Sequence, residues 1–271
     1  MPTAALFPGQ GSHVPGMRDL VAAHAPDLLD RCLRLVGDDP FDRAAESTRF
    51  AQPAIFCASV AGWRALDSDV RADVVAVAGH SLGELAALVA AEAVEAEAAL
   101  ELVVVRGRLM ADAGGGTMLA LLGADEETAD ALAHRHGVTV ANLNAPGQVV
   151  LSGDAAALDA AADAARAHGL RAMELGVAGA FHSPAMDPAG RAFAAALDDA
   201  DFAAPRVPVI SCSTAEPLTD PRRELAAGLT APVRWTATMR ALAEVADTFV
   251  DVGPGRVLHR LVKRNLETAS A

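Results

Sequence analysis

Hydrophobic and polar positions alternate along the chain with two different periods. Short apolar runs at residues 4–7 and 74–78 predict buried strands, and longer alanine-rich stretches with helical spacing follow each of them. The expected helices cover residues 20–36, 53–66, 84–93 and 95–113. Strands that alternate with helices in this way are typical of an α/β protein with a mostly parallel sheet.

The pattern changes after three consecutive glycines at residues 114–116. Strands are then expected at residues 118–122, 138–142, 149–152 and 172–175, helices at 126–136 and 155–168, and further strands of the first sheet at 207–212 and 248–252. The β-α-β-β-α-β order is that of a ferredoxin-like unit. We therefore expect a small ferredoxin-like subdomain over residues 117–177. It would be inserted into a larger α/β-hydrolase-like catalytic domain formed by residues 1–116 and 178–271.

Composition narrows the class of protein. The net charge of −13 argues against a nucleic-acid partner, because phosphate binding needs a basic face. The cysteines are scattered, without the spacing of a metal or redox site. The first residues lack the basic and apolar segments of a signal peptide, and no run is long and apolar enough to span a bilayer. We expect a cytoplasmic protein that makes no membrane contact.

Basic residues gather near the C-terminus, against the overall charge. They are Arg256, His259, Arg260, Lys263 and Arg264. One interpretation is a solvated helix end, where cations interact favourably with the helix dipole. The other is a docking patch for an acidic carrier protein. The sequence pattern alone leaves both open.

The strongest local motif is Gly79-His80-Ser81-Leu82-Gly83, a G-x-S-x-G sequence between an expected strand and an expected helix. Its glycines permit a turn too tight for Cβ atoms. Ser81 would project from the edge of the sheet at the start of a helix, where the dipole and free N–H groups favour developing negative charge. We interpret Ser81 as a nucleophile and the Leu82 N–H as an oxyanion donor, in preference to a chance match in a glycine- and alanine-rich chain.

A serine nucleophile needs a base to take its proton. His134, His136 and His168 lie in polar, helix-like stretches and are expected at the surface. His182 lies instead in an apolar, turn-rich junction where the chain returns to the larger sheet, so it is the expected base. The acidic residues between Ser81 and His182 belong mostly to amphipathic helices. We therefore expect a Ser–His pair oriented by a backbone carbonyl rather than a triad.

Two further groups could belong to the same site. Gln10 lies in a glycine-rich turn after the first strand, where the glycines either serve a tight bend alone or let the Gln10 N–H act as a second oxyanion donor. Arg106 shares a helix face with Val103 and Met110. It either extends to the surface and pairs there, or is buried and binds a carboxylate through its planar fork. The spacing favours neither reading.

Taken together, these motifs resemble the malonyl-CoA:acyl-carrier-protein transacylase family, which includes the acyltransferase domains of polyketide synthases. The resemblance runs over residues 6–265. The matching stretches, in chain order, are residues 7–12, 79–84, 106–110, 141–146, 179–183, 232–235 and 252–255. Several motifs in one order are more specific than any single motif.

The resemblance implies an acyltransferase that moves a malonyl group from malonyl-CoA to the phosphopantetheine thiol of an acyl carrier protein, in polyketide or fatty acid biosynthesis, without a metal or other cofactor. Ser81 would carry the acyl ester, and His182 would act as base and then as acid. The Gln10 and Leu82 N–H groups would form the oxyanion hole, and Arg106 would hold the malonyl carboxylate.

The resemblance also assigns neighbouring residues. His80 and Asn142 would border the substrate, and a backbone carbonyl from residues 231–234 would orient the histidine. Leu82 and Phe181 match the malonyl-preferring type, since a bulky Phe181 would crowd a methyl branch. Gly179 departs from it, because many malonyl-type domains within large synthases carry histidine there. We expect a discrete enzyme, without a fused synthase module, that acts on its carrier in trans.

Two other functions fit parts of this pattern. An editing hydrolase would use the same Ser81 and His182 to clear acyl groups from a carrier, with water as acceptor. A non-catalytic carrier-binding module would need neither of these residues. Arg106 favours transfer of a dicarboxylic acyl group over both alternatives.

Overall fold

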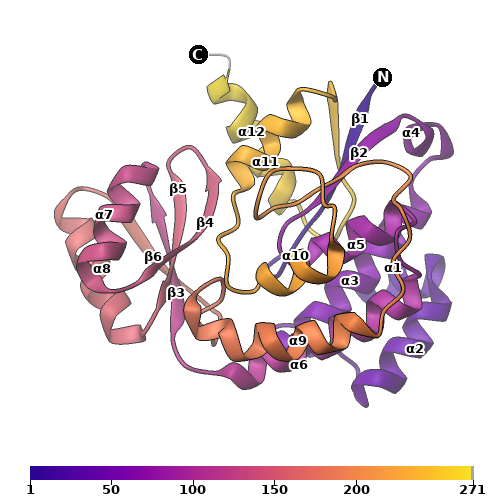
Figure 1. Cartoon of the computed structure of the whole chain (residues 1–271), viewed down its shortest axis with the longest axis horizontal. Coiled ribbons are helices and arrows are strands. Elements are labelled where there is room, and N and C mark those ends of the chain that lie inside the picture. Colours follow the sequence, from indigo (N-terminus) through magenta and orange to yellow (C-terminus); the bar gives the residue numbers. More distant parts are fainter. Residues whose placement is uncertain (270–271) are drawn as a thin grey trace.

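The computed structural model describes residues 1–269, in which the strands form a parallel sheet and an antiparallel sheet (Figure 1). The parallel sheet has the order β7-β2-β1-β8. Its strands are β1 (Thr3–Phe7), β2 (Val74–Gly79), β7 (Val209–Ile210) and β8 (Thr248–Asp251). Because all four strands run in one direction, their carboxyl ends meet at the same edge, where ligands bind in open α/β sheets.

Alternation along β1 places apolar side chains on both faces of the parallel sheet. Ala5 and Phe7 join one core and Ala4 and Leu6 join the other. The first core is covered by α1 (Met17–His24), α2 (Pro26–Val36), α3 (Thr48–Ala65), α5 (Gly83–Ala90), α6 (Ala96–Ala113) and α9 (Asp187–Asp198). The second is covered by α11 (Trp235–Ala243) and α12 (Val257–Ala269). The shorter connecting elements are α4 (Ser68–Ala72), η1 (Pro184–Met186) and α10 (Pro221–Ala227).

The second sheet is antiparallel, with the order β4-β5-β3-β6. Its strands are β3 (Thr117–Leu122), β4 (Thr139–Ala145), β5 (Gln148–Gly153) and β6 (Arg171–Leu175). Two helices, α7 (Glu126–His136) and α8 (Ala155–Ala167), pack on one face around a separate apolar core. Figure 1 shows this layer beside the parallel sheet, with its helices on the outside.

The two largest differences between the predicted helices and the structure lie before β2. The helical material expected over residues 20–36 is divided into two helices, because the chain breaks between α1 and α2 at Ala25, whose φ is −149° and ψ 54°. Pro26 has no N–H to continue the first helix and disfavours helical angles at the residue before it. The helix expected from residue 53 begins at Thr48 instead, where the Ser47 side chain accepts a hydrogen bond from the Arg49 N–H.

The C-terminal basic residues run from Arg256, just before α12, to Arg264, near the middle of that helix. The helix continues to Ala269, so the cations stand nearer its N-terminus, where the dipole disfavours positive charge. The interpretation of this cluster as a helix end that suits its cations is therefore wrong.

Within residues 1–269, no helix combines the length and the apolar character needed to cross a membrane.

Candidate active site

Ser81 lies in the tight turn between β2 and α5. Its φ of 52° is in the left-handed region, which costs a residue with a side chain about 1–3 kcal/mol. Glycines on both sides allow the turn. A Cβ on Gly79 would lie 1.9 Å from the Gly83 carbonyl carbon, and a Cβ on Gly83 would lie 2.0 Å from the Phe7 oxygen. This turn holds Ser81 at the carboxyl edge of the parallel sheet.

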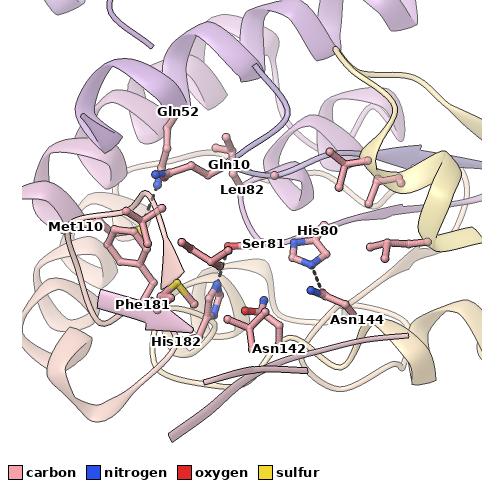
Figure 2. A pocket seen from close by; sticks show the side chains of 18 of the residues that line it. Gln10, Gln52, His80, Ser81, Leu82, Met110, Asn142, Asn144, Phe181 and His182 are labelled. Carbon is pink, nitrogen blue, oxygen red and sulfur yellow. Dashed lines mark hydrogen bonds between the residues drawn. The ribbon is translucent and has the colours of Figure 1, made fainter. Parts of the chain in front are cut away.

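His182, 101 residues further along the chain, is hydrogen-bonded to Ser81, with 2.8 Å between Nε2 and Oγ (Figure 2). The other ring nitrogen, Nδ1, is 2.9 Å from the Ala231 carbonyl oxygen. Because a carbonyl oxygen can only accept, Nδ1 carries the proton and Nε2 is left as the acceptor. In the part of the chain that the structure describes, no carboxylate pairs with His182. A Ser–His pair oriented by the backbone is what the geometry provides.

The orienting carbonyl is held in place by the second sheet. Val233 N donates to the Ala141 oxygen at 2.8 Å, and Leu143 N donates to the Val233 oxygen at 2.8 Å. These bonds tie the segment that contains Ala231 to β4. The family resemblance implied a carbonyl from residues 231–234 without selecting among them, and the structure assigns the role to Ala231.

Burial, followed by the positive charge of Arg106, lowers the pKa of His182 to about 4. The imidazole is therefore neutral at neutral pH. A neutral ring with a free Nε2 lone pair facing Ser81 Oγ can accept the hydroxyl proton.

Arg106 lines the cavity that contains Ser81 and His182. It is buried, with only 5% of its surface exposed. Its Nη2 donates to Ser81 Oγ at 3.0 Å. Burial lowers the pKa of Arg106 to about 10, and the nearby Glu84 carboxylate opposes that shift, so the guanidinium stays charged at neutral pH. The surface interpretation of Arg106 is therefore wrong. A buried cation beside Ser81 can bind an anionic group in the cavity.

Glu84 belongs to this neighbourhood, although the sequence gave no reason to single it out beyond its place in a matching stretch. It is 4% exposed in the first turn of α5, and its Oε1 accepts a hydrogen bond of 2.8 Å from Cys212 N. Burial raises the pKa of Glu84. The carboxylate thus ties α5 to the segment after β7 and supplies a counter-charge for Arg106.

The cavity has a volume of about 170 Å³ and is lined by Gln10, Leu82 and both members of the Ser–His pair. Figure 2 shows Gln10 and Leu82 on the side of Ser81 opposite His182. Within residues 1–269, neither the Gln10 nor the Leu82 backbone N–H donates a hydrogen bond to another protein group. Both amides remain available to a ligand.

His80 and Asn142 both line the cavity. His80 Nε2 lies 2.9 Å from the Oδ1 of Asn144, a residue that the sequence did not single out (Figure 2). Burial lowers the pKa of His80. Asn142 is 6% exposed, and its backbone pairs with Val233. The His80–Asn144 bond connects the nucleophile turn to β4.

Phe181 is buried and lines the cavity beside Met110 (Figure 2). A Cβ on Gly179 would lie 2.4 Å from Phe181 Cε1. A larger residue at position 179 would therefore displace the phenyl ring, so the departure noted at Gly179 and the bulk at Phe181 depend on each other.

Within residues 1–269, no group of three or more His, Cys, Asp or Glu side chains is placed to hold a metal ion.

Comparisons with known proteins identify relatives of this chain. The chain is 36% identical over 284 residues to the polyketide biosynthesis malonyl CoA-acyl carrier protein transacylase PksC of Bacillus subtilis, covering 98% of each protein. It is 38% identical over 278 residues to the polyketide biosynthesis protein ThaF of Burkholderia thailandensis, but spans only 24% of that longer protein.

Solved structures of similar proteins have the same fold. A malonyl CoA-acyl carrier protein transacylase from Burkholderia pseudomallei matches with a TM-score of 0.92 at 34% identity, over 98% of each chain. PlMCAT, a malonyl-transacylase in complex with the type II polyketide synthase acyl-carrier protein AntF, matches with a TM-score of 0.91 at 34% identity, over 99% of this chain and 94% of that one. The family model described as the acyl transferase domain matches residues 6–271. The chain therefore belongs to the acyl transferase domain family.

Proposed function

We propose that this protein is a malonyl-CoA:acyl-carrier-protein S-malonyltransferase, which transfers the malonyl group through an ester on Ser81. The observation that carries this proposal is the meeting of Ser81 Oγ, His182 Nε2 and Arg106 Nη2 in one cavity. The names of PksC and of the structural neighbours support the same activity.

In the first half-reaction, His182 Nε2 takes the proton of Ser81 Oγ while that oxygen attacks the thioester carbonyl. The Gln10 and Leu82 N–H groups stabilise the oxyanion. The carbon–sulfur bond then breaks, and coenzyme A leaves with the proton held on His182. Arg106 binds the free malonyl carboxylate and fixes the acyl group beside Ser81.

In the second half-reaction, the phosphopantetheine thiol of the carrier gives its proton to His182 Nε2 while its sulfur attacks the ester carbonyl. The bond from carbonyl carbon to Ser81 Oγ breaks, and Ser81 recovers its proton from His182. The malonyl carbonyl carbon keeps its oxidation state when it passes between a thioester and an ester. The proposed cycle therefore calls for no redox cofactor.

An editing hydrolase would form the same ester on Ser81, but water would replace the carrier thiol as the acceptor of the acyl group. Arg106 favours transfer of a dicarboxylic acyl group, and a module that only binds carriers would need no Ser–His contact. We expect that incubation with malonyl-CoA and a phosphopantetheine-bearing carrier yields malonyl-carrier faster than free malonate. Intact-protein mass measures the loaded carrier, and quantification of free malonate in the solution measures hydrolysis. Malonate release that outpaces carrier loading would favour the hydrolase instead.

The pH dependence of malonyl transfer should follow His182. Protonation below its pKa removes the base, so activity falls as pH falls through that value. With the pKa lowered to about 4, the acid limb of kcat/KM, which reports the free enzyme, is expected well below the ordinary 6.5. The bound malonyl carboxylate offsets the charge of Arg106, so the acid limb of kcat is expected at higher pH. Initial rates measured across pH, with circular dichroism to verify folding, give both acid limbs. Acid limbs of kcat/KM and kcat that coincide near pH 6.5 would contradict these expectations.

The basic residues of α12 support a docking place for the carrier. Val257, Leu258 and Leu261 of the same helix line the cavity, while Arg260 and Lys263 are exposed. An acidic carrier bound to that exposed side would stand close to the mouth of the site.

A cytoplasmic location fits a reaction that uses coenzyme A thioesters.

The two sheets correspond to the domain division we propose. Residues 117–177 would form a ferredoxin-like subdomain, supported by the strand order β4-β5-β3-β6 and the helices α7 and α8 on one face. Residues 1–116 and 178–271 would form an α/β-hydrolase-like domain, supported by the parallel sheet and the strand–turn–helix around Ser81. The site lies where both parts contribute residues.

A further inference from the structure

Helix α12 is tied by two side chains to the hairpin of β4 and β5. Apolar residues of α12 line the cavity, and the two ties lie further along the same helix. Arg264 Nη1 donates to Gln148 Oε1 at 2.8 Å. Asn265 Nδ2 donates to the Asn144 oxygen at 3.0 Å. Because Gln148 and Asn144 also line the cavity, the helix and the hairpin are fixed to each other at its edge.

Asn265 is a buried polar residue, with only 7% of its surface exposed. Its second amide hydrogen goes to the Leu261 oxygen, which is 2.9 Å from Nδ2, so both donors of the side chain are used. Within residues 1–269, its Oδ1 has no hydrogen-bond partner. An unpaired buried acceptor costs stability, and such exceptions concentrate at functional sites. The donor side of this amide is therefore the part that acts on the protein.

Asn144 connects Asn265 to the nucleophile turn. Its backbone oxygen accepts from Asn265, while its side-chain Oδ1 lies 2.9 Å from His80 Nε2 (Figure 2). Because an amide oxygen can only accept, His80 Nε2 carries the proton in this contact. The bond from Asn265 thus fixes the point on β4 from which the Asn144 side chain reaches His80.

His80 precedes Ser81 and is held closely on several sides. Its backbone N donates to the Phe7 oxygen at 2.9 Å, and its oxygen accepts from Gly83 N at 3.0 Å. Its ring centroid is 5.3 Å from that of Trp235. A residue held in this way cannot shift its ring without disturbing the next residue, which is Ser81 in its left-handed conformation.

We propose that Asn265 is a positioning residue that connects α12 to the nucleophile turn through Asn144 and His80. A strained conformation such as that of Ser81 persists only while its surroundings hold it, and this series of hydrogen bonds is one of its supports. Without the Asn265 donor, the His80 ring can take other positions, and Ser81 Oγ is less often aligned with its base. This inference rests on the proposed function. It adds that the helix proposed to dock the carrier also holds the turn that carries the ester.

Two substitutions at position 265 test this role in turnover. Asn265→Leu removes the amide at similar volume, and Asn265→Asp keeps the shape but directs an acceptor at the Asn144 oxygen. Both are expected to lower kcat for malonyl transfer to a carrier by about tenfold, because a small misplacement of the nucleophile slows attack. KM for malonyl-CoA and for the carrier should change by less than about twofold, since no substrate contact is removed.

Nitrogen-15 NMR of the histidine rings gives a readout that does not depend on turnover. The buried, hydrogen-bonded N–H of His80 is expected to give a resolved signal, identified by its absence from His80→Asn. That signal should shift or broaden in both Asn265 variants. Val262→Ala is the matched control, because Val262 is partly buried on α12 against the second core. Shortening it loosens the helix while leaving the Asn265 amide in place, so the signal and kcat should stay as in the wild type.

The outcomes separate this role from the proposed function. An unchanged His80 signal or a wild-type kcat in both Asn265 variants would overturn the positioning role alone. A Val262→Ala protein that loses as much kcat as they do would also overturn it, because general loosening of α12 would then explain the loss. A wild-type protein that takes no malonyl group would overturn the proposed function, and the His80 signal would still decide whether Asn265 holds the turn.

Discussion

Replacing Ser81 by alanine is expected to abolish covalent labelling of the protein by malonyl-CoA and to lower malonyl transfer by about 10⁴-fold or more. The hydroxyl is the group that forms the ester, and its Oγ is 2.8 Å from His182 Nε2. No water held in its place can give an acyl-enzyme. Radiolabel retained after denaturation, together with intact-protein mass, measures the loss directly.

A serine elsewhere provides the control for this variant. Ser152 is fully buried in β5 with an Oγ that has no partner among residues 1–269, and it does not line the cavity. Ser152→Ala should label like the wild type. Malonyl label that persists on Ser81→Ala would place the nucleophile at another residue and would remove the basis of the proposed cycle.

The parts of the site that the sequence predicted are those encoded locally. The Ser81 turn combines a strand, two glycines and a helix within a few residues, so its geometry follows from short-range rules. His182 stood out because it lies in an apolar junction. Their contact spans 101 residues, and it was predicted from the need of a serine nucleophile for a base, with support from the resemblance to a family.

The parts that the sequence did not predict depend on contacts between distant segments. The helix expected from the sequence began at residue 53, which left Gln52 outside it. The helix begins five residues earlier, at Thr48, and turns Gln52 toward α6. The choice of Ala231 as the orienting carbonyl likewise depends on hydrogen bonds between Val233 and β4. Local periodicity carries no information about such pairings.

Replacing Arg106 by alanine is expected to lower kcat/KM for malonyl-CoA by about 100-fold or more, while some acetyl transfer persists. Arg106 is a buried cation that lines the cavity, and its loss leaves the malonyl carboxylate without a counter-charge in a desolvated place. Rates with both thioesters, measured side by side, report the change in preference. Unchanged malonyl turnover would end the role of Arg106 as the carboxylate ligand.

The same substitution makes a second, independent prediction about His182. The charge of Arg106 is one of the causes that lower the pKa of His182, so removing it should raise that pKa. The acid limb of acetyl-CoA turnover should then move to higher pH in Arg106→Ala than in the wild type. Arg108→Ala, an exposed arginine two residues further along α6, is the control and should shift neither the preference nor the limb. A lost malonyl preference without this shift would mean that Arg106 binds the carboxylate but does not set the basicity of His182.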